Sequence, residues 1–133
     1  MKKLLPIFIT ALLLVGCAAP TEREVSYRQI TMDEAVAMMK EEQNYIILDV
    51  RTAAEFDEKH IPGAINIPNE TIGTDAIPAL TDQDQLILVY CRSGNRSKQA
   101  SEKLVKLGYT NIVEFGGIID WPGETETNEG GTV

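Results

Sequence analysis

Two kinds of apolar segment alternate along this chain of 133 residues. The first kind is a short, nearly uninterrupted run of branched apolar residues. Such a run predicts a buried strand, because a sheet covered on both faces buries both sides of each strand. The second kind spaces its apolar residues three or four apart, which predicts an amphipathic helix. The predicted strands are residues 27–30, 45–50, 64–67, 86–90 and 111–114.

Helices are predicted in the intervals between these strands. Two of them begin with a capping box, in which Thr31 or Thr52 is followed three residues later by a glutamate. Gly108 is placed to end the last helix, and Pro78 limits the length of the third. The predicted helices are residues 31–42, 52–59, 75–80 and 97–107. Strands that alternate with helices in this way are typical of an open α/β fold.

The amino-terminal segment has the pattern of a targeting signal. Lys2 and Lys3 precede an apolar stretch, residues 4–15, that is too short to cross a membrane comfortably. The stretch ends in Leu14-Val15-Gly16-Cys17, which resembles a bacterial lipobox, where cleavage precedes a cysteine that is then lipid-modified. An ordinary secretory signal, cleaved near Ala18, is the alternative.

The lipobox pattern predicts how the chain is divided and where it resides. We expect a signal peptide over residues 1–16 and then, over 17–26, a lipidated Cys17 with a short tether. The remainder is long enough for one domain, residues 27–122, and the polar, glycine-rich residues 123–133 are expected to be a flexible tail. The protein is then a component of the bacterial cell envelope. Its lipid would anchor it on the outer side of the cytoplasmic membrane or in the outer membrane.

Charge and cysteine content limit the partners. The chain has 20 acidic and 12 basic residues and a net charge of −8 at pH 7, which argues against binding to nucleic acid. Its two cysteines are Cys17 and Cys91. If Cys17 carries lipid, Cys91 is a free thiol with no second cysteine to resolve it. A covalent intermediate on Cys91 would then have to discharge to an acceptor outside the chain.

Cys91 directly follows the predicted strand 86–90 and precedes a short polar loop and a helix. Ligands of open α/β sheets bind at the carboxyl ends of the strands, and backbone N–H groups at a helix start favour an anion. Residues 91–100 contain the bases Arg92, Arg96 and Lys98 and no acidic residue, against the acidic background of the chain. Such surroundings lower the pKa of a thiol and so favour the reactive thiolate.

The loop composition also suits an anion. Gly94 and Asn95 tolerate left-handed backbone angles, so the loop can turn successive N–H groups inward around a bound anion. The loop residues Arg92, Ser93, Gly94, Asn95 and Arg96 are therefore the candidate substrate-binding residues, with Cys91 as the candidate nucleophile. A buried structural cysteine before an ordinary strand-to-helix loop is the alternative.

Several motifs, in the same order, resemble those of the rhodanese-like (sulfurtransferase) domain family. They include an Asp-Val-Arg strand end, a His-Ile-Pro-Gly-Ala-x-Asn-Ile-Pro segment and the Cys91 loop. The matching segments are residues 46–51, 55–56, 60–68, 90–97, 107–109 and 116–117, and Trp121. The resemblance covers roughly residues 27 to 122.

The resemblance implies a three-layer α/β/α fold with a five-stranded parallel sheet. It also implies that Cys91 accepts a sulfane sulfur as a persulfide and passes it to a second acceptor. The spacing from Cys91 to Arg96 is Cys-x4-Arg, whereas phosphatases of the same fold use a wider Cys-x5-Arg loop. The shorter loop favours sulfur over phosphate.

Four further residues could support the site. Asp49 and Arg51 flank the end of the second predicted strand, and either belong to the mouth of the site or form an ion pair that fixes local geometry. Ser97, where the helix pattern starts, is a third supporting candidate. His60 could be a base for Cys91, or its ring could bond backbone in a turn. One histidine and one free cysteine make no credible metal site, and we expect neither a metal nor a cofactor.

These observations predict an enzyme, a thiosulfate sulfurtransferase of the rhodanese type. It would move a sulfane sulfur from thiosulfate or a persulfide donor to a thiol or to cyanide. Its expected partners are therefore a small anionic sulfur donor and a thiol or cyanide acceptor, with a sulfur-relay protein as a further candidate. The alternative is a persulfide carrier or interaction module that does not turn over small molecules quickly.

Overall fold

The computed structural model describes residue 16 and residues 26–128. Five strands form one parallel sheet in the order β1-β5-β4-β2-β3. The strands are β1 (Arg28–Gln29), β2 (Tyr45–Asp49), β3 (Ile65–Asn66), β4 (Leu86–Cys91) and β5 (Ile112–Gly117). Their number and parallel pairing confirm the predicted sheet.

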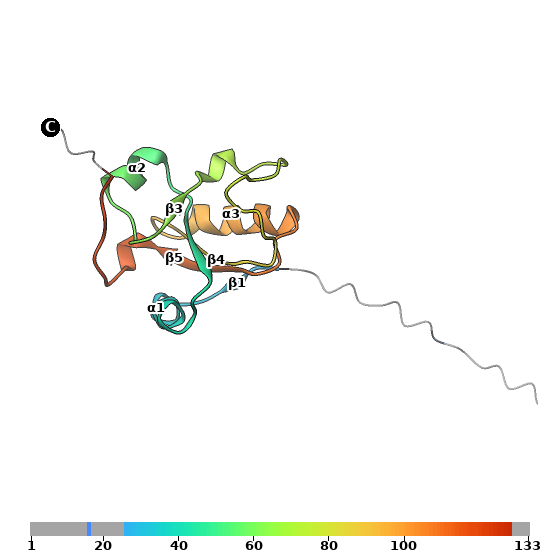
Figure 1. Ribbon diagram of the computed structural model, residues 1–133, viewed down its shortest axis with the longest axis horizontal. Helices are drawn as coiled ribbons and strands as arrows, with labels where there is room; N and C mark the ends of the chain where they lie inside the picture. Colours follow the sequence, from blue (N-terminus) through green and yellow to red (C-terminus); the bar gives the residue numbers. More distant parts are fainter. Residues whose placement is uncertain (1–15, 17–25, 129–133) are drawn as a thin grey trace, which may run out of the picture.

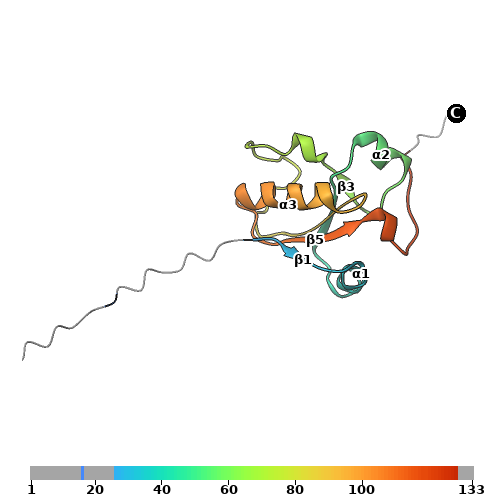
Figure 2. The same ribbon diagram turned by 180° about the vertical axis from the view of Figure 1, so that it is seen from behind.

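The helices complete three layers. Helix α1 (Met32–Glu41) covers one face of the sheet and α3 (Asn95–Lys106) the other (Figures 1 and 2). Helix α2 (Ala53–Glu58) lies near the carboxyl ends of the strands. This is the predicted α/β/α arrangement.

The central strand β4 divides the core into two clusters. Successive side chains of a strand point to opposite faces, so Ile87, Val89 and Cys91 pack toward α3. Leu88 and Tyr90 belong to the cluster on the side of α1. The sulfur of Cys91 therefore lies on the α3 side of the sheet, at the end of its central strand.

Both predicted capping boxes are present. The Thr31 hydroxyl accepts from the N–H of Glu34, and the Thr31 N–H donates to the Glu34 carboxylate at 2.8 Å. Thr52 and Glu55 exchange the same pair of bonds at the start of α2. Gly108 follows α3 with a φ of +99°, a left-handed conformation suited to a helix end.

The predicted helix over residues 75–80 is wrong. These residues form no helix, and a short 3-10 turn, η1 (Asn69–Thr71), precedes them instead. Only a single turn forms there, in which the N–H of Leu80 donates to the carbonyl of Ile77 at 3.0 Å. Pro78 lies in the middle of the segment and lacks an N–H, so too few bonds remain to nucleate a helix of six residues.

The predicted flexible tail differs from the structure where the structure describes it. Glu126 forms an antiparallel bridge with His60, with N–H···O distances of 2.8 and 2.9 Å. The N–H of Asn128 donates to the carbonyl of Asp57 in α2 at 2.9 Å. The bridge itself is formed by backbone groups, which every residue carries, so the sequence pattern gave no signal for it. Residues 129–133 lie outside the described part.

Most of the amino-terminal predictions fall outside the described residues. Of the expected signal peptide only Gly16 is described, and the lipidation site Cys17 is not. Among the residues described, no helix is long and apolar enough to cross a membrane.

Candidate active site

Cys91 is the last residue of β4, and its side chain is buried, with 1% of the residue exposed. The chain then turns through residues 92–94 into α3, which begins at Asn95, two residues before the predicted start. Gly94 is the N-cap and has a φ of +110°, which other residues rarely adopt. The turn that aims the loop at the sulfur therefore requires glycine at this position.

The sulfur is bonded by the loop and by the first turn of α3. The Gly94 N–H donates to Cys91 Sγ at 3.0 Å, and the Cys91 thiol donates to Ser97 Oγ at 3.4 Å. Burial raises the pKa of the thiol, but hydrogen bonds involving Ser97, Gly94 and Ser93 outweigh burial, and the net pKa lies below the ordinary value. Of the backbone donors predicted from residues 92–96, the Gly94 N–H bonds Sγ directly, and the backbone of Ser93 also favours the thiolate.

Strand β5 packs against the Cys91 loop, and its pairing with β4 is irregular at this point. Val89 pairs with Glu114, and Cys91 pairs with Gly117, so two steps along β4 match three along β5. Gly116, in the extra step, has a φ of +97°. A Cβ at Gly117 would overlap the carbonyl group of Arg92, so the loop can lie this close to β5 only where β5 has no side chain.

Glu114 belongs to the site and was not predicted from the sequence. Its residue is 3% exposed, and its Oε1 accepts from the Ser97 hydroxyl at 2.6 Å and from the Gly116 N–H at 2.9 Å. A single glutamate in an apolar strand, at a position expected to be buried, was the signal that could have identified it.

Arg96 is engaged by a residue far away in the sequence. Its guanidinium forms two bonds to the Glu55 carboxylate of α2, at 2.6 and 3.0 Å. Hydrogen bonding from Arg96 lowers the pKa of Glu55 to about 2. Arg96 therefore stands beside the loop as a paired charge, and its role in binding an anionic donor stays a prediction.

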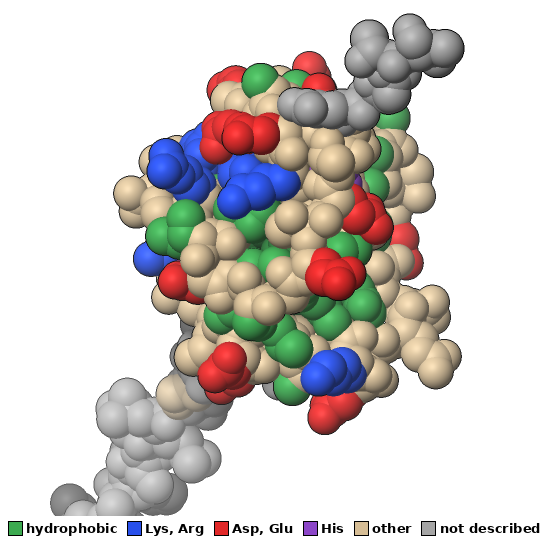
Figure 3. All heavy atoms as spheres, turned by 90° about the vertical axis from the view of Figure 1, so that its left-hand side faces the viewer, with side chains coloured by type: hydrophobic (Ala, Val, Ile, Leu, Met, Phe, Trp, Pro, Cys, Tyr) green, Lys and Arg blue, Asp and Glu red, His purple; other side chains and the backbone are tan. Residues whose placement is uncertain are grey.

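Arg92 is exposed and lines a cleft of about 380 Å³ next to the loop. The other lining residues are Arg51, Glu55, Glu58, Lys59, Ile118 and Ile119. Figure 3 shows this end of the molecule, where basic side chains gather beside acidic ones and apolar side chains lie around them. The cleft therefore lies beside the Cys91 loop and has mixed charge at its rim.

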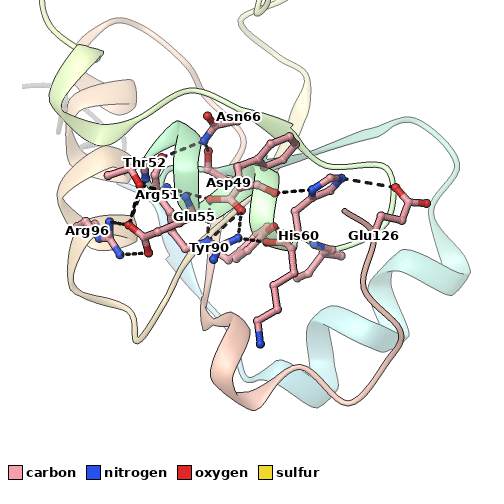
Figure 4. Close-up of polar contacts among 12 residues, drawn as sticks. Asp49, Arg51, Thr52, Glu55, His60, Asn66, Tyr90, Arg96 and Glu126 are labelled. Atoms are coloured by element: carbon pink, nitrogen blue, oxygen red, sulfur yellow. Dashed lines mark hydrogen bonds and ion pairs between the residues drawn. The ribbon is translucent and has the colours of Figure 1, made fainter. Parts of the chain in front are cut away.

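Asp49 and Arg51 form a buried ion pair beneath the cleft. Arg51 Nη2 lies 2.7 Å from Asp49 Oδ2 and also donates to the carbonyl of Lys59 at 2.6 Å (Figure 4). The guanidinium lies 5.8 Å from the centre of the Tyr90 ring, and the Tyr90 hydroxyl accepts from the N–H of Ile61. Among the described residues, neither charged side chain bonds the sulfur. The bond from Arg51 to the Lys59 carbonyl instead joins the end of β2 to the segment after α2.

The ring of His60 bonds backbone, as the turn interpretation expected. Its Nδ1 lies 2.8 Å from the carbonyl oxygen of Phe56, and the two rings stack with centres 3.8 Å apart. Its Nε2 lies 3.6 Å from Glu126 Oε2 (Figure 4). Both ring nitrogens of His60 therefore face groups other than Cys91, which favours a structural role over that of a base. The contacts hold α2 to the segment around Glu126.

Comparison with known proteins agrees with this geometry. The sequence model of one family, described as Rhodanese-like domain, matches residues 31–123. The chain is 37% identical over 73 residues to "Thiosulfate sulfurtransferase PspE" of Escherichia coli (strain K12), covering 55% of this chain and 70% of that protein. It is 30% identical over 107 residues to "Putative sulfur carrier protein YrkF" of Bacillus subtilis (strain 168), covering 80% of this chain and 57% of that protein. A solved structure of rhodanese with anions from E. coli matches with a TM-score of 0.57 and 32% identity, covering 62% of this chain and 98% of that chain.

Proposed function

Because this chain belongs to the rhodanese-like domain family, we propose that it transfers sulfane sulfur through a persulfide on Cys91. The observation that carries the proposal is the sulfur's setting, in which the Gly94 N–H and Ser97 Oγ bond Sγ and the pKa of the thiol is lowered. A thiolate held by fixed donors is prepared for nucleophilic attack.

In the first half-reaction, the Cys91 thiolate attacks the outer sulfur of thiosulfate. A new sulfur–sulfur bond forms, the bond to the sulfonate sulfur breaks, and sulfite leaves with the electron pair. The product is a Cys91 persulfide anion, and we expect N–H groups of the loop to stabilise its terminal sulfur as the Gly94 N–H stabilises Sγ.

In the second half-reaction, a nucleophile attacks the terminal sulfur of the persulfide. The acceptor, cyanide or a thiolate, gains the sulfur, and the electron pair of the broken bond returns to Cys91 as thiolate. The two half-reactions share one covalent intermediate, so ping-pong kinetics are expected.

A carrier that receives sulfur from a protein is the second candidate. It is favoured by the pairing of Arg96 with Glu55, which leaves less free positive charge for a doubly negative thiosulfate. The relative YrkF is named as a putative sulfur carrier. For this chain, a protein partner would then supply or remove the sulfur at the cleft beside Arg92.

The test is the intact mass of the full chain in a Cys17→Ala background, where Cys91 is the sole cysteine. With thiosulfate we expect a gain of one sulfur atom that cyanide removes and that Cys91→Ser abolishes. A gain with persulfide donors but not with thiosulfate would favour the carrier. No adduct with any donor would refute Cys91 as a sulfur acceptor.

We also propose that the protein is a lipoprotein of the bacterial envelope, anchored through Cys17. The support is the sequence alone, namely the basic start, the short apolar stretch and the Gly16-Cys17 junction. Metabolic labelling with a fatty acid in a bacterial host tests it. Label that persists in Cys17→Ala would contradict the assignment.

A further inference from the structure

Among the residues that the structure describes, Ile119 is the one large apolar residue that is mostly exposed, at 63%. It belongs to the short 3-10 turn η2 (Ile118–Asp120), which follows β5. Its neighbour Ile118 is buried, at 6% exposed, and packs into the core cluster on the side of α1. A single exposed apolar residue is common on protein surfaces and by itself implies no partner. The significance of Ile119 comes from where it lies and how it is held.

Ile119 lies against the Cys91 loop. Its N–H donates to the carbonyl of Arg92 at 3.3 Å, and Arg92 directly follows the nucleophile in the sequence. Both residues line the cleft of about 380 Å³ beside the loop. Glu55 lines the same cleft and is bonded to Arg96, at the other end of the loop. The exposed apolar side chain therefore stands at the rim of a cleft that adjoins the nucleophile's own loop.

The turn that carries Ile119 is fixed on both sides. Before it, Gly117 lies so close to the carbonyl of Arg92 that a Cβ would not fit between them. After it, the N–H of Trp121 donates to the carbonyl of Ile118 at 3.1 Å. A side chain that is already held in place loses less conformational freedom when a partner covers it, so its contact contributes more to affinity.

Charge at the cleft is not balanced once ion pairs are set aside. Two of the charged residues that line it, Arg51 and Glu55, belong to ion pairs. The other three have exposed side chains that form no ion pair within the described part of the chain, namely Arg92, Lys59 and Glu58. Two bases and one acid are thus unpaired here, although the whole chain carries a net charge of −8. A partner with an acidic group beside an apolar one complements this rim.

The cleft is also larger than a small acceptor needs. Its volume of about 380 Å³ lies in the range of pockets that hold drug-sized molecules. Cyanide would fill little of that space and offers no apolar group to Ile119. A cysteine within a protein chain presents its thiol together with the side chains of its neighbours. Such an acceptor can cover Ile119 and face the unpaired bases at the same time.

We propose that the natural sulfur acceptor of Cys91 is a cysteine of a partner protein with an apolar and an acidic residue next to it. Ile119 contacts the apolar neighbour, and Arg92 and Lys59 attract the acidic one. In the transfer, the partner's thiolate attacks the terminal sulfur of the Cys91 persulfide, a sulfur–sulfur bond forms on the partner, and the electron pair of the broken bond returns to Cys91. The inference rests on the proposed function in taking the Cys91 persulfide as the donor, and it adds the class of acceptor.

The first experiment follows discharge of the persulfide to peptides, with the full chain in the Cys17→Ala background. The probe is the end-blocked tripeptide Leu-Cys-Glu, compared with Gly-Cys-Glu and Leu-Cys-Gln. Intact mass measures loading by thiosulfate or polysulfide and then the rate of discharge. Each rate is divided by the peptide's rate with a small persulfide in solution, which removes differences in thiol reactivity.

Leu-Cys-Glu is expected to be the best of the three acceptors. It should discharge the persulfide about tenfold faster than Gly-Cys-Glu at low peptide concentration, because leucine buries apolar surface against Ile119. It should be about threefold faster than Leu-Cys-Gln at low salt, as for an exposed ion pair. Equal rates for the three peptides would overturn the proposal, and a preference for leucine alone would overturn its acidic part.

Variants at the rim assign the two preferences. Ile119→Ser is expected to reduce the preference for leucine to less than about twofold, and Ile119→Leu is expected to keep it. Asp120→Asn is the matched control, because Asp120 is exposed in the same turn and lies outside the cleft lining. Lys59→Gln is expected to reduce only the preference for glutamate, which high salt also weakens. A preference for leucine that persists in Ile119→Ser, or is lost equally in Asp120→Asn, would overturn the assignment to Ile119.

A binding measurement separates this inference from the proposed function. The peptide Leu-Ser-Glu has no thiol, so it binds the unloaded chain without reacting. In isoleucine-methyl NMR we expect it to shift the resonance of Ile119, identified by its loss in Ile119→Leu, and not that of the buried Ile87 in β4. Shifts at Ile119 without sulfur loading from any donor would refute the proposed function and still support the docking surface. No shift at Ile119 would overturn the docking surface even where Cys91 gains sulfur.

Discussion

Arg96 and Glu55, 41 positions apart in the sequence, are joined by two hydrogen bonds that tie the Cys91 loop to α2. A donor with negative charge must compete with Glu55 for the Arg96 guanidinium. We expect Glu55→Gln to lower the KM for thiosulfate several-fold, since one of the pair's charges is removed. Steady-state kinetics measure it, with Glu58→Gln as control. Glu58 is on the same helix and lines the same cleft, and its carboxylate forms no ion pair with any residue that the structure describes. An equal change in both variants would show only a general charge effect.

The same ion pair makes stability depend on pH. Hydrogen bonding from Arg96 lowers the pKa of Glu55 from 4.5 to about 2, so the pair contributes stability above the ordinary pKa and loses it as pH falls toward 2. Because both side chains are partly exposed, the contribution is about 1 kcal/mol. Urea unfolding is expected to show a gap between the unsubstituted chain and Glu55→Gln that closes in acid. If the difference in unfolding free energy between the two proteins stayed constant as pH falls, the Glu55–Arg96 pair would not be its cause.

Gly117→Ala is expected to damage the site more than the fold. Its Cβ would overlap the Arg92 carbonyl group, so the loop must shift away from β5. We expect a loss of about 2 kcal/mol in unfolding free energy, as for overpacking. Sulfur transfer is expected to fall by more than about tenfold, because donors to the sulfur move. Gly73→Ala, where a Cβ meets nothing, is the control and is expected to change neither quantity.

Tyr90→Phe is expected to affect stability and to leave sulfur transfer unchanged. The Tyr90 hydroxyl accepts from the Ile61 N–H at 3.1 Å in the core, and the substitution leaves that N–H unpaired. We expect a loss of about 1–2 kcal/mol. Thermal unfolding beside the persulfide mass assay measures both effects. Loss of persulfide formation in the folded variant would show that Tyr90 reaches the site.

Asp49→Asn is expected to be the most destabilising of these changes. It leaves the Arg51 guanidinium buried, at 3% exposed, without its carboxylate partner. Breaking a buried pair on one side costs about 3–5 kcal/mol. Chemical unfolding is the measurement. A loss below that of Tyr90→Phe would show that the pair contributes little to the fold.

Local signals in the sequence predicted what local interactions determine. The two threonine–glutamate capping boxes, the glycine after α3 and the turn after Cys91 each depend on residues a few positions apart, and all are present. The helix predicted around Pro78 was wrong, because the helical periodicity there is weak and proline lacks the N–H that a helix needs. The capping box accounted for Glu55 in the sequence, so its second role was not predicted. Its carboxylate accepts from the Thr52 N–H and also binds Arg96.

Glu114 was missed for a different reason. Its partners are a helix residue 17 positions earlier and a glycine in its own strand, brought together by the irregular pairing of β4 and β5. No pattern of apolar residues encodes that irregularity. A sequence can place the nucleophile by its motif, but the buried polar groups around it depend on how two strands are offset.

The sheet places its two longest strands, β4 and β5, inside and a strand of two residues at each edge. An edge that short exposes few unpaired N–H and C=O groups to a neighbouring molecule. The proposed anchor would crowd many copies onto a bilayer. Even then, the short edge strands would give a neighbouring molecule few backbone groups with which to pair a strand. Resistance to aggregation would then come from the strand order itself.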